Sequence, residues 1–350
     1  MTVDEQTLAA VDPEALGRFL SRRLPELAGP FELRRLGEGQ SCLTFLVRGD
    51  GWEAVLRRPP RGDLPPTAFD VSREFRVMSA LVQAGAPVPV PRPLALCEDR
   101  SVLGAPFYLM ERVNGVVVRD QVPEGLSALS DRKRMAAQLV DTLLDLHGVD
   151  WHAAGLAGFG KPEGYLERQL RRMGDLWGLA RFRDIPEIDE VGAWLAEHRP
   201  EQRSAAIVHG DFKLDNAMFA PTGPADLVAV VDWEMSTIGD PLADLGWLLY
   251  FWRDPGDADL GLRVASVTDL DGFPRRHEVL ESYARRSPIS VEDIRWYVAL
   301  AGWKIAIIME GSYRRFLAGI TDHADFVRLE EAVPALARRA RQTASGELSL

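Results

Sequence analysis

The stretch from residue 208 to residue 234 constrains the fold and chemistry of this chain more than any other. It consists of V-H-G-D-F-K-L-D-N-A-M-F, a short turn, and L-V-A-V-V-D-W-E. Two apolar runs, Ala217–Phe219 and 227–231, have the composition of β-strands and flank the turn-forming residues 221–224. The pattern therefore predicts a β-hairpin.

Polar side chains stand at both ends of this predicted hairpin. Asn216 precedes the first strand, Asp232 follows the second, and Asp211 lies in the loop just before. The hairpin would thus bring one potential base to face two potential metal ligands. Phosphoryl transfer needs such a set, because a carboxylate must orient or deprotonate the attacking hydroxyl and Mg²⁺ must neutralise the phosphates. The alternative is an acidic hairpin without chemistry, which an ordered set of three groups disfavours.

Three segments resemble one family. H-G-D-F-K-L-D-N (209–216) is similar to the catalytic loop of aminoglycoside phosphotransferase-type small-molecule kinases, and V-V-D-W-E (230–234) to the segment with their metal-binding aspartate. G-D-P-L-A-D-L (239–245) also resembles that family. Protein kinases carry H-R-D and D-F-G at the matching places and an A-P-E segment further on. Gly210 and Trp233 stand there instead, which favours the small-molecule branch.

The resemblance implies an ATP-dependent kinase that phosphorylates a hydroxyl group of a small molecule. It assigns the role of catalytic base to Asp211 and the binding of Mg²⁺ to Asn216 and Asp232. It also implies an α+β, bilobal, protein-kinase-like fold. We expect a nucleotide-binding N-lobe over residues 1–112, with an N-terminal helix, a five-stranded antiparallel sheet and one further helix. A mainly helical C-lobe over residues 113–350 would hold the catalytic hairpin at 208–233 and the acceptor-binding helices.

Local patterns agree with that fold. Asp12 followed by Pro13 and Glu14 is a typical helix start. Glycine-containing turns separate strand-like segments at 31–36, 43–47 and 52–57, which predicts an antiparallel meander. Further strands are predicted at 94–97 and 106–110, and helices at 72–84, 131–147, 164–181, 188–198, 240–248, 278–286, 291–317 and 326–341. The last residues, 342–350, read as a frayed tail.

The turn between the first two strands is the expected phosphate-binding loop. In the resembled family this turn, with Gly37, Gly39 and Ser41, lies over the ATP phosphates. Glycines let backbone N–H groups approach an anion without obstruction by side chains. Cys42 takes the third glycine position of a G-x-G-x-x-G pattern, so the loop departs from the protein-kinase form. Taken alone, the segment indicates an ordinary hairpin rather than a phosphate-binding loop.

Arg57 stands where kinases place a strand lysine on the α- and β-phosphates. Arginine can bind phosphate through its planar fork, but it does not replace lysine without consequence. Arg58, on the opposite face of the strand, is the alternative in register. The resemblance pairs Glu74 with Arg57, whereas a glutamate in the first turn of a helix is also favoured by the helix dipole alone.

The segment after the last predicted strand of the N-lobe resembles the hinge between the lobes of such kinases. In that family the hinge backbone binds adenine, so the resemblance assigns this task to the C=O of Glu111 and the N–H of Val113. A hinge requires one backbone path but no special side chain.

Other polar residues around the hairpin have two interpretations each. His209 is expected to fix the loop, because Asp211 occupies the position of the base. Lys213 would steady the γ-phosphoryl group or be a solvated lysine. The resemblance implies that Asp244 accepts hydrogen bonds from the catalytic-loop backbone, and the alternative is a surface aspartate near a helix start. Tryptophans in the C-lobe are read mainly as core residues, with one or two in the acceptor pocket: Trp151, Trp177, Trp194, Trp247, Trp252, Trp296 and Trp303.

Composition narrows the function classes. The 350 residues include 41 basic and 52 acidic side chains, a net charge of −11, which argues against a general nucleic-acid binder. The two cysteines have no zinc-site spacing, so we expect reduced thiols and a cytoplasmic protein. The N-terminus lacks the apolar core of a signal peptide. The longest apolar run, 297–309, contains Lys304 and is too short to span a bilayer, so we expect no membrane partner.

Two further functions stay open at this level. A kinase-like nucleotide-binding module without turnover is favoured by Arg57 and Cys42, and disfavoured by the set of Asp211, Asn216 and Asp232. Within the kinase reading the acceptor is open, since fold does not set substrate. L-R-R-P-P (56–60) also resembles the kinase domains fused to acyl-CoA dehydrogenases of lipid metabolism. A hydroxyacyl thioester therefore competes with an aminoglycoside, choline or a sugar as the acceptor. The use of ATP rather than GTP and the oligomeric state are not set by these patterns.

Overall fold

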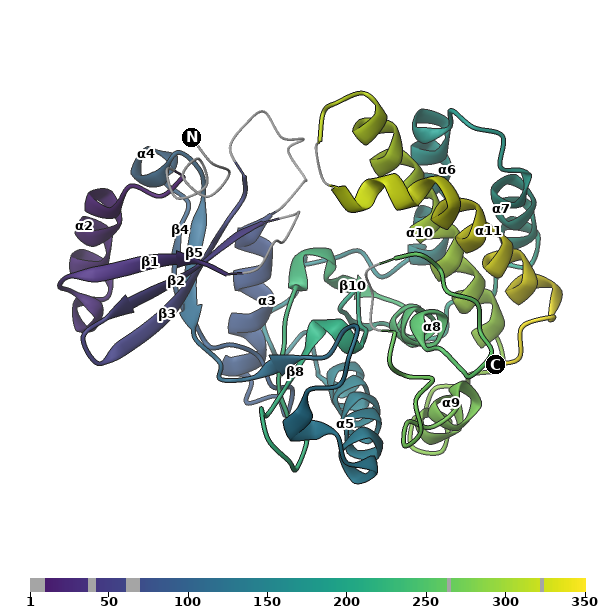
Figure 1. Cartoon of the computed structure of the whole chain (residues 1–350), viewed down its shortest axis with the longest axis horizontal. Helices are drawn as coiled ribbons and strands as arrows, with labels where there is room; N and C mark the ends of the chain where they lie inside the picture. The colour runs from purple at the N-terminus through teal and green to yellow at the C-terminus, as the bar shows by residue number, and fades with distance from the viewer. Residues whose placement is uncertain (1–9, 37–41, 61–69, 263–265, 322–323) are drawn as a thin grey trace. The chain divides into compact units, whose positions relative to one another are not determined.

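A computed structural model describes residues 10–36, 42–60, 70–262, 266–321 and 324–350. The chain forms two compact units (Figure 1). The first consists of Met1–Asn114 and Val228–Ser236, and the second of Gly115–Leu227 and Thr237–Leu350. Each unit is described separately below.

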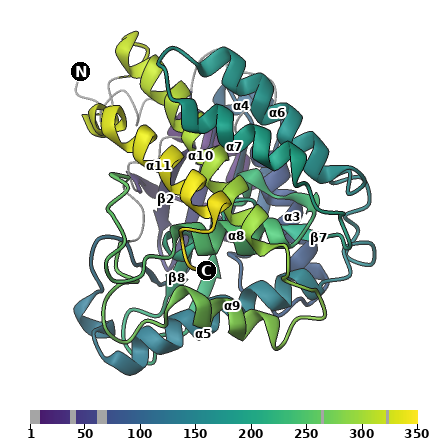
Figure 2. The ribbon, with the colours of Figure 1, turned by 90° about the vertical axis from the view of Figure 1, so that its right-hand side faces the viewer.

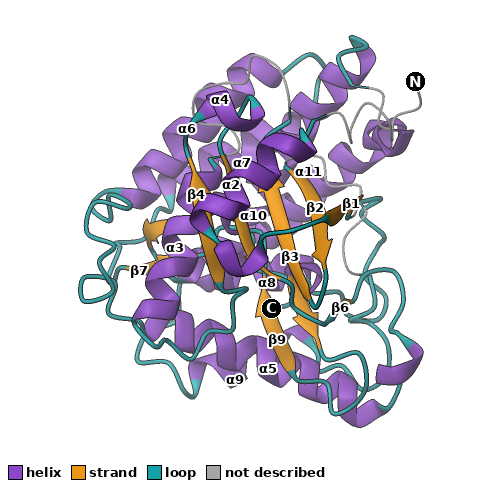
Figure 3. Cartoon of the chain, turned by 90° about the vertical axis from the view of Figure 1, so that its left-hand side faces the viewer, coloured by secondary structure: helices purple, strands orange, loops and turns teal. Residues whose placement is uncertain are grey.

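The first unit is built on a five-stranded antiparallel sheet in the order β1-β2-β3-β5-β4, with strands drawn in orange in Figure 3. Its strands are β1 (Phe31–Arg35), β2 (Leu43–Gly49), β3 (Trp52–Arg58), β4 (Pro93–Cys97) and β5 (Phe107–Glu111). In the centre of the sheet Leu56 pairs with Phe45 on one side and with Leu109 on the other. The predicted antiparallel sheet is confirmed.

Helices cover both faces of this sheet (Figure 1). They are α2 (Pro13–Arg23), α3 (Val71–Gln83) and α4 (Arg100–Leu103), with the short 3₁₀ turns η1 (Pro25–Leu27) and η4 (Trp233–Met235). The Asp12 carboxylate caps α2 by accepting from the backbone N–H of Glu14 at 2.9 Å, as the sequence predicts. Leu16 and Leu20 of α2 are fully buried in one apolar cluster with alternate residues of the strands. The opposite face of β5 packs against α3.

The segment 228–236 belongs to the first unit by its contacts. The Val230 N–H donates to the Pro89 carbonyl at 2.8 Å, and Arg73 Nε donates to the Ser236 carbonyl at 2.8 Å. The expected division, at residue 112 with the whole hairpin 208–233 in the C-lobe, differs from this arrangement. Here the chain leaves the first unit after Asn114 and returns to it within the second strand of the hairpin. The reason is that η4 packs on α3, an interaction that no local pattern encodes.

The second unit is mainly helical, as predicted. Its helices are α5 (Leu129–Gly148), α6 (Tyr165–Ala180), α7 (Pro186–Glu197), α8 (Leu242–Phe251), α9 (Arg276–Ala284), α10 (Ile294–Leu317) and α11 (Leu329–Ser345), with 3₁₀ turns η2 (Glu124–Leu126), η3 (Leu214–Asn216) and η5 (Ala324–Arg328). Figure 2 shows α10 and α11 side by side. Most of α10 is buried because it also packs against α6, α7 and α8. No helix in the described ranges has the length and apolarity needed to cross a membrane.

Short strands carry the loops of the second unit. They are β6 (Val116–Val117), β7 (Ala206–Val208), β8 (Ala217–Phe219), β9 (Leu227–Val230), which runs on into the first unit, and β10 (Thr237–Gly239). β7 pairs with β10, and β6, β8 and β9 form a small sheet in that order. The Ala220 N–H donates to the Asp226 carbonyl at 2.8 Å and closes the turn between β8 and β9. The predicted hairpin is confirmed.

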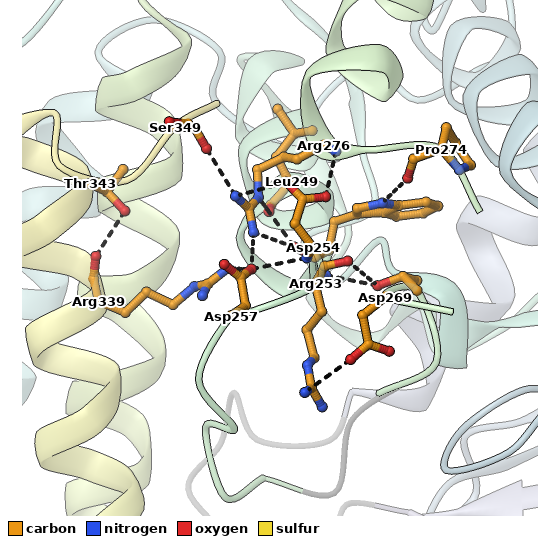
Figure 4. Close-up of polar contacts among 12 residues, drawn as sticks. Leu249, Arg253, Asp254, Asp257, Asp269, Pro274, Arg276, Arg339, Thr343 and Ser349 are labelled. Carbon is orange, nitrogen blue, oxygen red and sulfur yellow. Dashed lines mark hydrogen bonds and ion pairs between the residues drawn. The ribbon is translucent and has the colours of Figure 1, made fainter. Parts of the chain in front are cut away.

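A buried polar cluster fixes the C-terminal end of the second unit (Figure 4). Arg276 donates to the carbonyls of Trp252 and Ser349 and forms ion pairs with Asp254 and Asp257. Arg339 of α11 also pairs with Asp257, at 2.9 Å. The prediction of a frayed tail at 342–350 is wrong, because α11 continues to residue 345 and a buried arginine then binds the chain end.

Candidate active site

The loop between β7 and β8 carries the motif that the sequence analysis singles out. Asp244, in the first turn of α8, is fully buried and accepts from the His209 N–H at 2.6 Å and the Gly210 N–H at 2.8 Å. Gly210 has φ +87°, a left-handed conformation that glycine adopts without strain. Asp244 therefore fixes the path of this loop, as the resemblance implies, and the alternative of a surface aspartate is wrong.

The Asp211 carboxylate is held by donors on both of its oxygens. Oδ1 accepts from Trp247 Nε1 at 2.7 Å. Oδ2 accepts from Asn216 Nδ2 at 2.7 Å and from Lys213 Nζ at 2.6 Å. Since charge-assisted hydrogen bonds of this length are strong and directional, the carboxylate has a single orientation. The structure thus brings Asp211 and Asn216 together, and it places Lys213 on the candidate base itself.

His209 serves the geometry of the same loop. It is fully buried, and its Nδ1 accepts from the Asp211 N–H at 3.2 Å. This contact fits the expectation that His209 fixes the loop. Nearby, His147 at the end of α5 bonds to the Tyr283 hydroxyl at 2.8 Å and lies 3.7 Å from Asp244, so it also supports the loop.

The first unit holds the second set of predicted residues. Arg57 Nε lies 3.2 Å from Glu74 Oε2, so the predicted ion pair is present. Arg57 Nη2 also lies 2.6 Å from Asp232 Oδ1 and 3.9 Å from Glu234 Oε2. Arg58 points to the opposite face of β3, where it is fully buried and donates to the Leu103 carbonyl at 2.9 Å. Strand alternation thus selects Arg57 for the site and gives Arg58 a structural role.

Burial and neighbouring charges shift the pKa values of the groups around Arg57. Burial raises the pKa of Glu74 to about 8, although Arg57 and the Tyr108 hydroxyl, which donates to it at 3.0 Å, act in the other direction. Burial alone would lower the pKa of Arg57, but the carboxylates of Glu74 and Asp232 raise it well above its usual value. Burial likewise raises the pKa of the Cys42 thiol, to about 12. The carboxylates of Asp232 and Glu234 lie 2.6 Å and 3.9 Å from the Arg57 guanidinium.

Asp232 is held in an unfavourable backbone conformation. Among the non-glycine residues that the structure describes, it alone has a positive φ, of +70°. Strain of this kind costs about 1–3 kcal/mol and persists where the surroundings impose it, most often at functional sites. Oδ1 of Asp232 is used by Arg57, and Oδ2 accepts no hydrogen bond from a described residue.

The other residues predicted to bind the nucleotide belong to the phosphate loop and to the hinge. Gly37, Gly39 and Ser41 lie outside the described residues. Glu111 ends β5, and its side chain pairs with Arg92 at 3.2 Å. Val113 follows, and within the described ranges no hydrogen bond engages its backbone.

Sequence reasoning missed three residues of these sets. The sequence pattern places Trp247 among the mainly core tryptophans, yet its Nε1–H donates to Asp211 and its ring faces the Lys304 ammonium, 5.4 Å from the ring centroid. A signal for it exists, since Trp247 lies three residues after Asp244 and therefore on the same face of α8. Glu234 follows Asp232 by two residues and was not distinguished. The sequence pattern shows Lys304 only as a charged residue that interrupts the apolar run 297–309.

The local features define a class of protein. The first unit has a kinase-type antiparallel sheet whose strand arginine pairs with a helix glutamate. The second has a helical body that presents an oriented carboxylate on a loop tied to an aspartate of the next helix. These are the parts of a kinase-fold phosphotransferase.

The comparison with known families agrees. Residues 32–279 match the model of the phosphotransferase enzyme family. The chain therefore belongs to the phosphotransferase enzyme family.

Two curated relatives are longer than this chain. The chain is 38% identical over 314 residues to acyl-CoA dehydrogenase family member 10 of Mus musculus, covering 89% of this chain and 29% of that protein. It is 38% identical over 319 residues to acyl-CoA dehydrogenase family member 11 of Gallus gallus, covering 88% and 40%. The chain thus spans less than half the length of these relatives.

Solved structures share the fold. A protein of Ralstonia eutropha, assigned provisionally as an aminoglycoside phosphotransferase, is 33% identical with a TM-score of 0.80, and the match covers 96% of this chain and 98% of that one. An aminoglycoside 2″-phosphotransferase solved with GDP and kanamycin matches with a TM-score of 0.62 at 16% identity, covering 93% and 97%. A thermostable mutant of an aminoglycoside phosphotransferase, in a ternary complex with ADP and hygromycin B, matches with a TM-score of 0.59 at 18% identity, covering 93% and 98%. These last two show the fold alone.

Proposed function

We propose that this chain transfers the γ-phosphoryl group of ATP to a hydroxyl group of a small molecule. The observation that carries the proposal is the Asp211 carboxylate, oriented by Trp247, Asn216 and Lys213 on a loop that Asp244 ties down. A protein that only binds nucleotide has no need of such a group. The ADP and GDP bound to related folds support a nucleotide as the donor.

In the proposed reaction Asp211 orients the acceptor hydroxyl and accepts its proton. The acceptor oxygen forms a bond to the γ-phosphorus while the bond from that phosphorus to the bridging oxygen of ADP breaks. Lys213, already on the Asp211 carboxylate, is the residue that we assign to steady the transferred group. Arg57, fixed by Glu74, neutralises the α- and β-phosphates. The C=O of Glu111 and the N–H of Val113 are the proposed adenine contacts, with Gly37, Gly39 and Ser41 as the phosphate loop.

Asn216 and Asp232 are the proposed magnesium ligands, and their contacts suit that role. The Asn216 amide nitrogen donates to Asp211, so the amide oxygen is the atom that would bind a metal. Asp232 binds Arg57 through Oδ1, which leaves Oδ2. Mg²⁺ prefers such oxygen ligands and would supply neutralisation of phosphate charge.

The test is ADP release by the purified chain with ATP and Mg²⁺ over a panel of acceptors: aminoglycosides, macrolides, choline, sugars and hydroxyacyl-CoAs. Asp211→Asn should lower turnover by about 10²–10⁴ at nearly unchanged ATP affinity, the usual value of general-base catalysis. Asp120→Asn, at an exposed position, is the matched control. Full activity of the Asp211 variant would refute the assigned role.

A second candidate is a nucleotide-binding module without turnover. It is favoured by Arg57, whose guanidinium is engaged by carboxylates where kinases carry a lysine. Stabilisation by ATP and Mg²⁺ without ADP release for any acceptor would select this candidate.

The acceptor class is also a proposal. The names of the curated relatives connect the chain to acyl-CoA chemistry, so a hydroxyacyl thioester competes with an antibiotic as the acceptor. Both described cysteines are free and buried, which is consistent with the proposed cytoplasmic location.

A further inference from the structure

The middle of α10 contains a buried lysine, Lys304, that forms no ion pair with a carboxylate of the described residues. The Lys304 side chain is 7% exposed, yet it forms no hydrogen bond or ion pair with any residue that the structure describes. The Lys304 ammonium forms a cation–π contact with the Trp247 ring, with Nζ 5.4 Å from the ring centroid. Lysine is almost never buried unless it is paired, because removing an ammonium group from water is costly. A lysine in this state needs an explanation.

The two carboxylates whose charges act on Lys304, those of Asp244 and Asp211, accept hydrogen bonds from other groups. Asp244 accepts from the backbone of the catalytic loop, and Asp211 accepts from Trp247, Asn216 and Lys213. Their charges act on Lys304 without a direct contact. Burial nevertheless lowers the pKa of Lys304 to about 8, so these carboxylates do not compensate for its burial.

A second cation, Arg172, acts electrostatically on Lys304. Arg172 of α6 is exposed and forms no ion pair within the described ranges, and its charge contributes to the lowered pKa of Lys304. α6 and α10 pack against each other. Lys304 and Arg172 thus stand on two helices that pack against each other, and the positive charge of Arg172 disfavours the charged form of Lys304.

We propose that Lys304 and Arg172 bind an anionic group of the acceptor, a carboxylate or a phosphate, beside the catalytic carboxylate. The inference rests on the proposed phosphotransferase function and specifies its substrate class. Trp247 sets the spacing, since its N–H binds Asp211 while its ring lies under Lys304. Such a site selects hydroxylated anions and disfavours polycationic antibiotics.

The first test measures binding without turnover, by calorimetry with matched probes. The probes are inorganic phosphate, 3-hydroxybutyrate, its neutral amide, and 3-hydroxybutyryl pantetheine with and without the 4′-phosphate. Lys304→Met should weaken binding of the anions about 10- to 100-fold, the usual loss for a charge-assisted contact. Lys304→Arg should retain most of it, Arg172→Met should lose several-fold, and the exposed Lys133→Met should change nothing. The carboxylate and phosphate arms show which anion the site takes.

The second test measures turnover with the same pairs. Lys304→Met should raise KM for the anionic acceptor and leave KM for ATP unchanged. Equal binding of acid and amide by the wild-type chain, or unchanged anion binding in Lys304→Met and Arg172→Met, would overturn the subsite. Anion binding that depends on Lys304, but without ADP release, would keep the subsite and reject the kinase. Turnover that depends on Asp211 but occurs only with neutral or cationic acceptors would keep the proposed kinase function and reject the anion subsite.

Discussion

Replacing Lys304 by methionine should make the protein more stable. The side chains have similar length and apolar stems, so methionine fills the same space in α10 without the charge. The pKa of Lys304 is about 8 instead of 10.5. Since a tenfold change in the protonation equilibrium corresponds to about 1.4 kcal/mol, burial of the charge costs about 3 kcal/mol. The contact with the Trp247 ring returns about 0.5–2 kcal/mol, so Lys304→Met should gain about 1–3 kcal/mol at pH 7.

The pH dependence of this gain has a defined sign. Below pH 8 the lysine is charged in both folded and unfolded chains, and the full cost applies. Between pH 8 and 10.5 the folded lysine is neutral while the unfolded one still binds a proton, so wild-type stability rises with pH relative to the variant. The groups that act on this titration are Asp244 of α8, Asp211 of the loop and Arg172 of α6. The difference between the proteins should therefore shrink at high pH.

Urea unfolding at pH 7 and pH 9.5 measures both effects. The comparison includes Lys133→Met, which removes the same charge from an exposed position of α5 and should be neutral at both pH values. A Lys304 variant less stable than wild type at pH 7 would refute the reasoning, and so would a gain that does not fall at pH 9.5. Either result would mean that Lys304 has a compensating partner in the folded chain.

Three further predictions concern other contacts. Trp247→Phe removes the hydrogen bond to Asp211 and should lower kcat about tenfold in steady-state assays, with KM for ATP unchanged. Asp257→Asn breaks the buried ion cluster of Arg276 and should cost about 3–5 kcal/mol in urea unfolding, without affecting KM. Arg57→Lys should change KM for ATP measurably, because an ammonium cannot reproduce the bidentate contacts of the guanidinium, and an unchanged KM would contradict its place at the phosphates.

Much of the fold follows from local patterns. The five strands of the first unit and the hairpin at β8 and β9 appear in the sequence as short apolar runs between glycine or proline turns. The helix starts at Asp12 and Asp70 are side-chain caps that depend only on neighbouring residues. Strand alternation also separates Arg57 from Arg58, since adjacent side chains point to opposite faces of a sheet. The contacts that these residues make with distant parts of the chain do not follow from local patterns.

Local patterns in the sequence predict the loop at 209–216, its candidate base Asp211 and the strand that carries Arg57, because each depends on residues a few positions apart. Packing between distant segments sets three further features: Trp247 donates to Asp211, Lys304 is buried with no ion pair among the described residues, and a buried arginine binds the C-terminal residues. The physical reason is that these contacts join residues tens of positions apart. Helix packing brings them together, and the periodicity of a single helix contains no record of its neighbour.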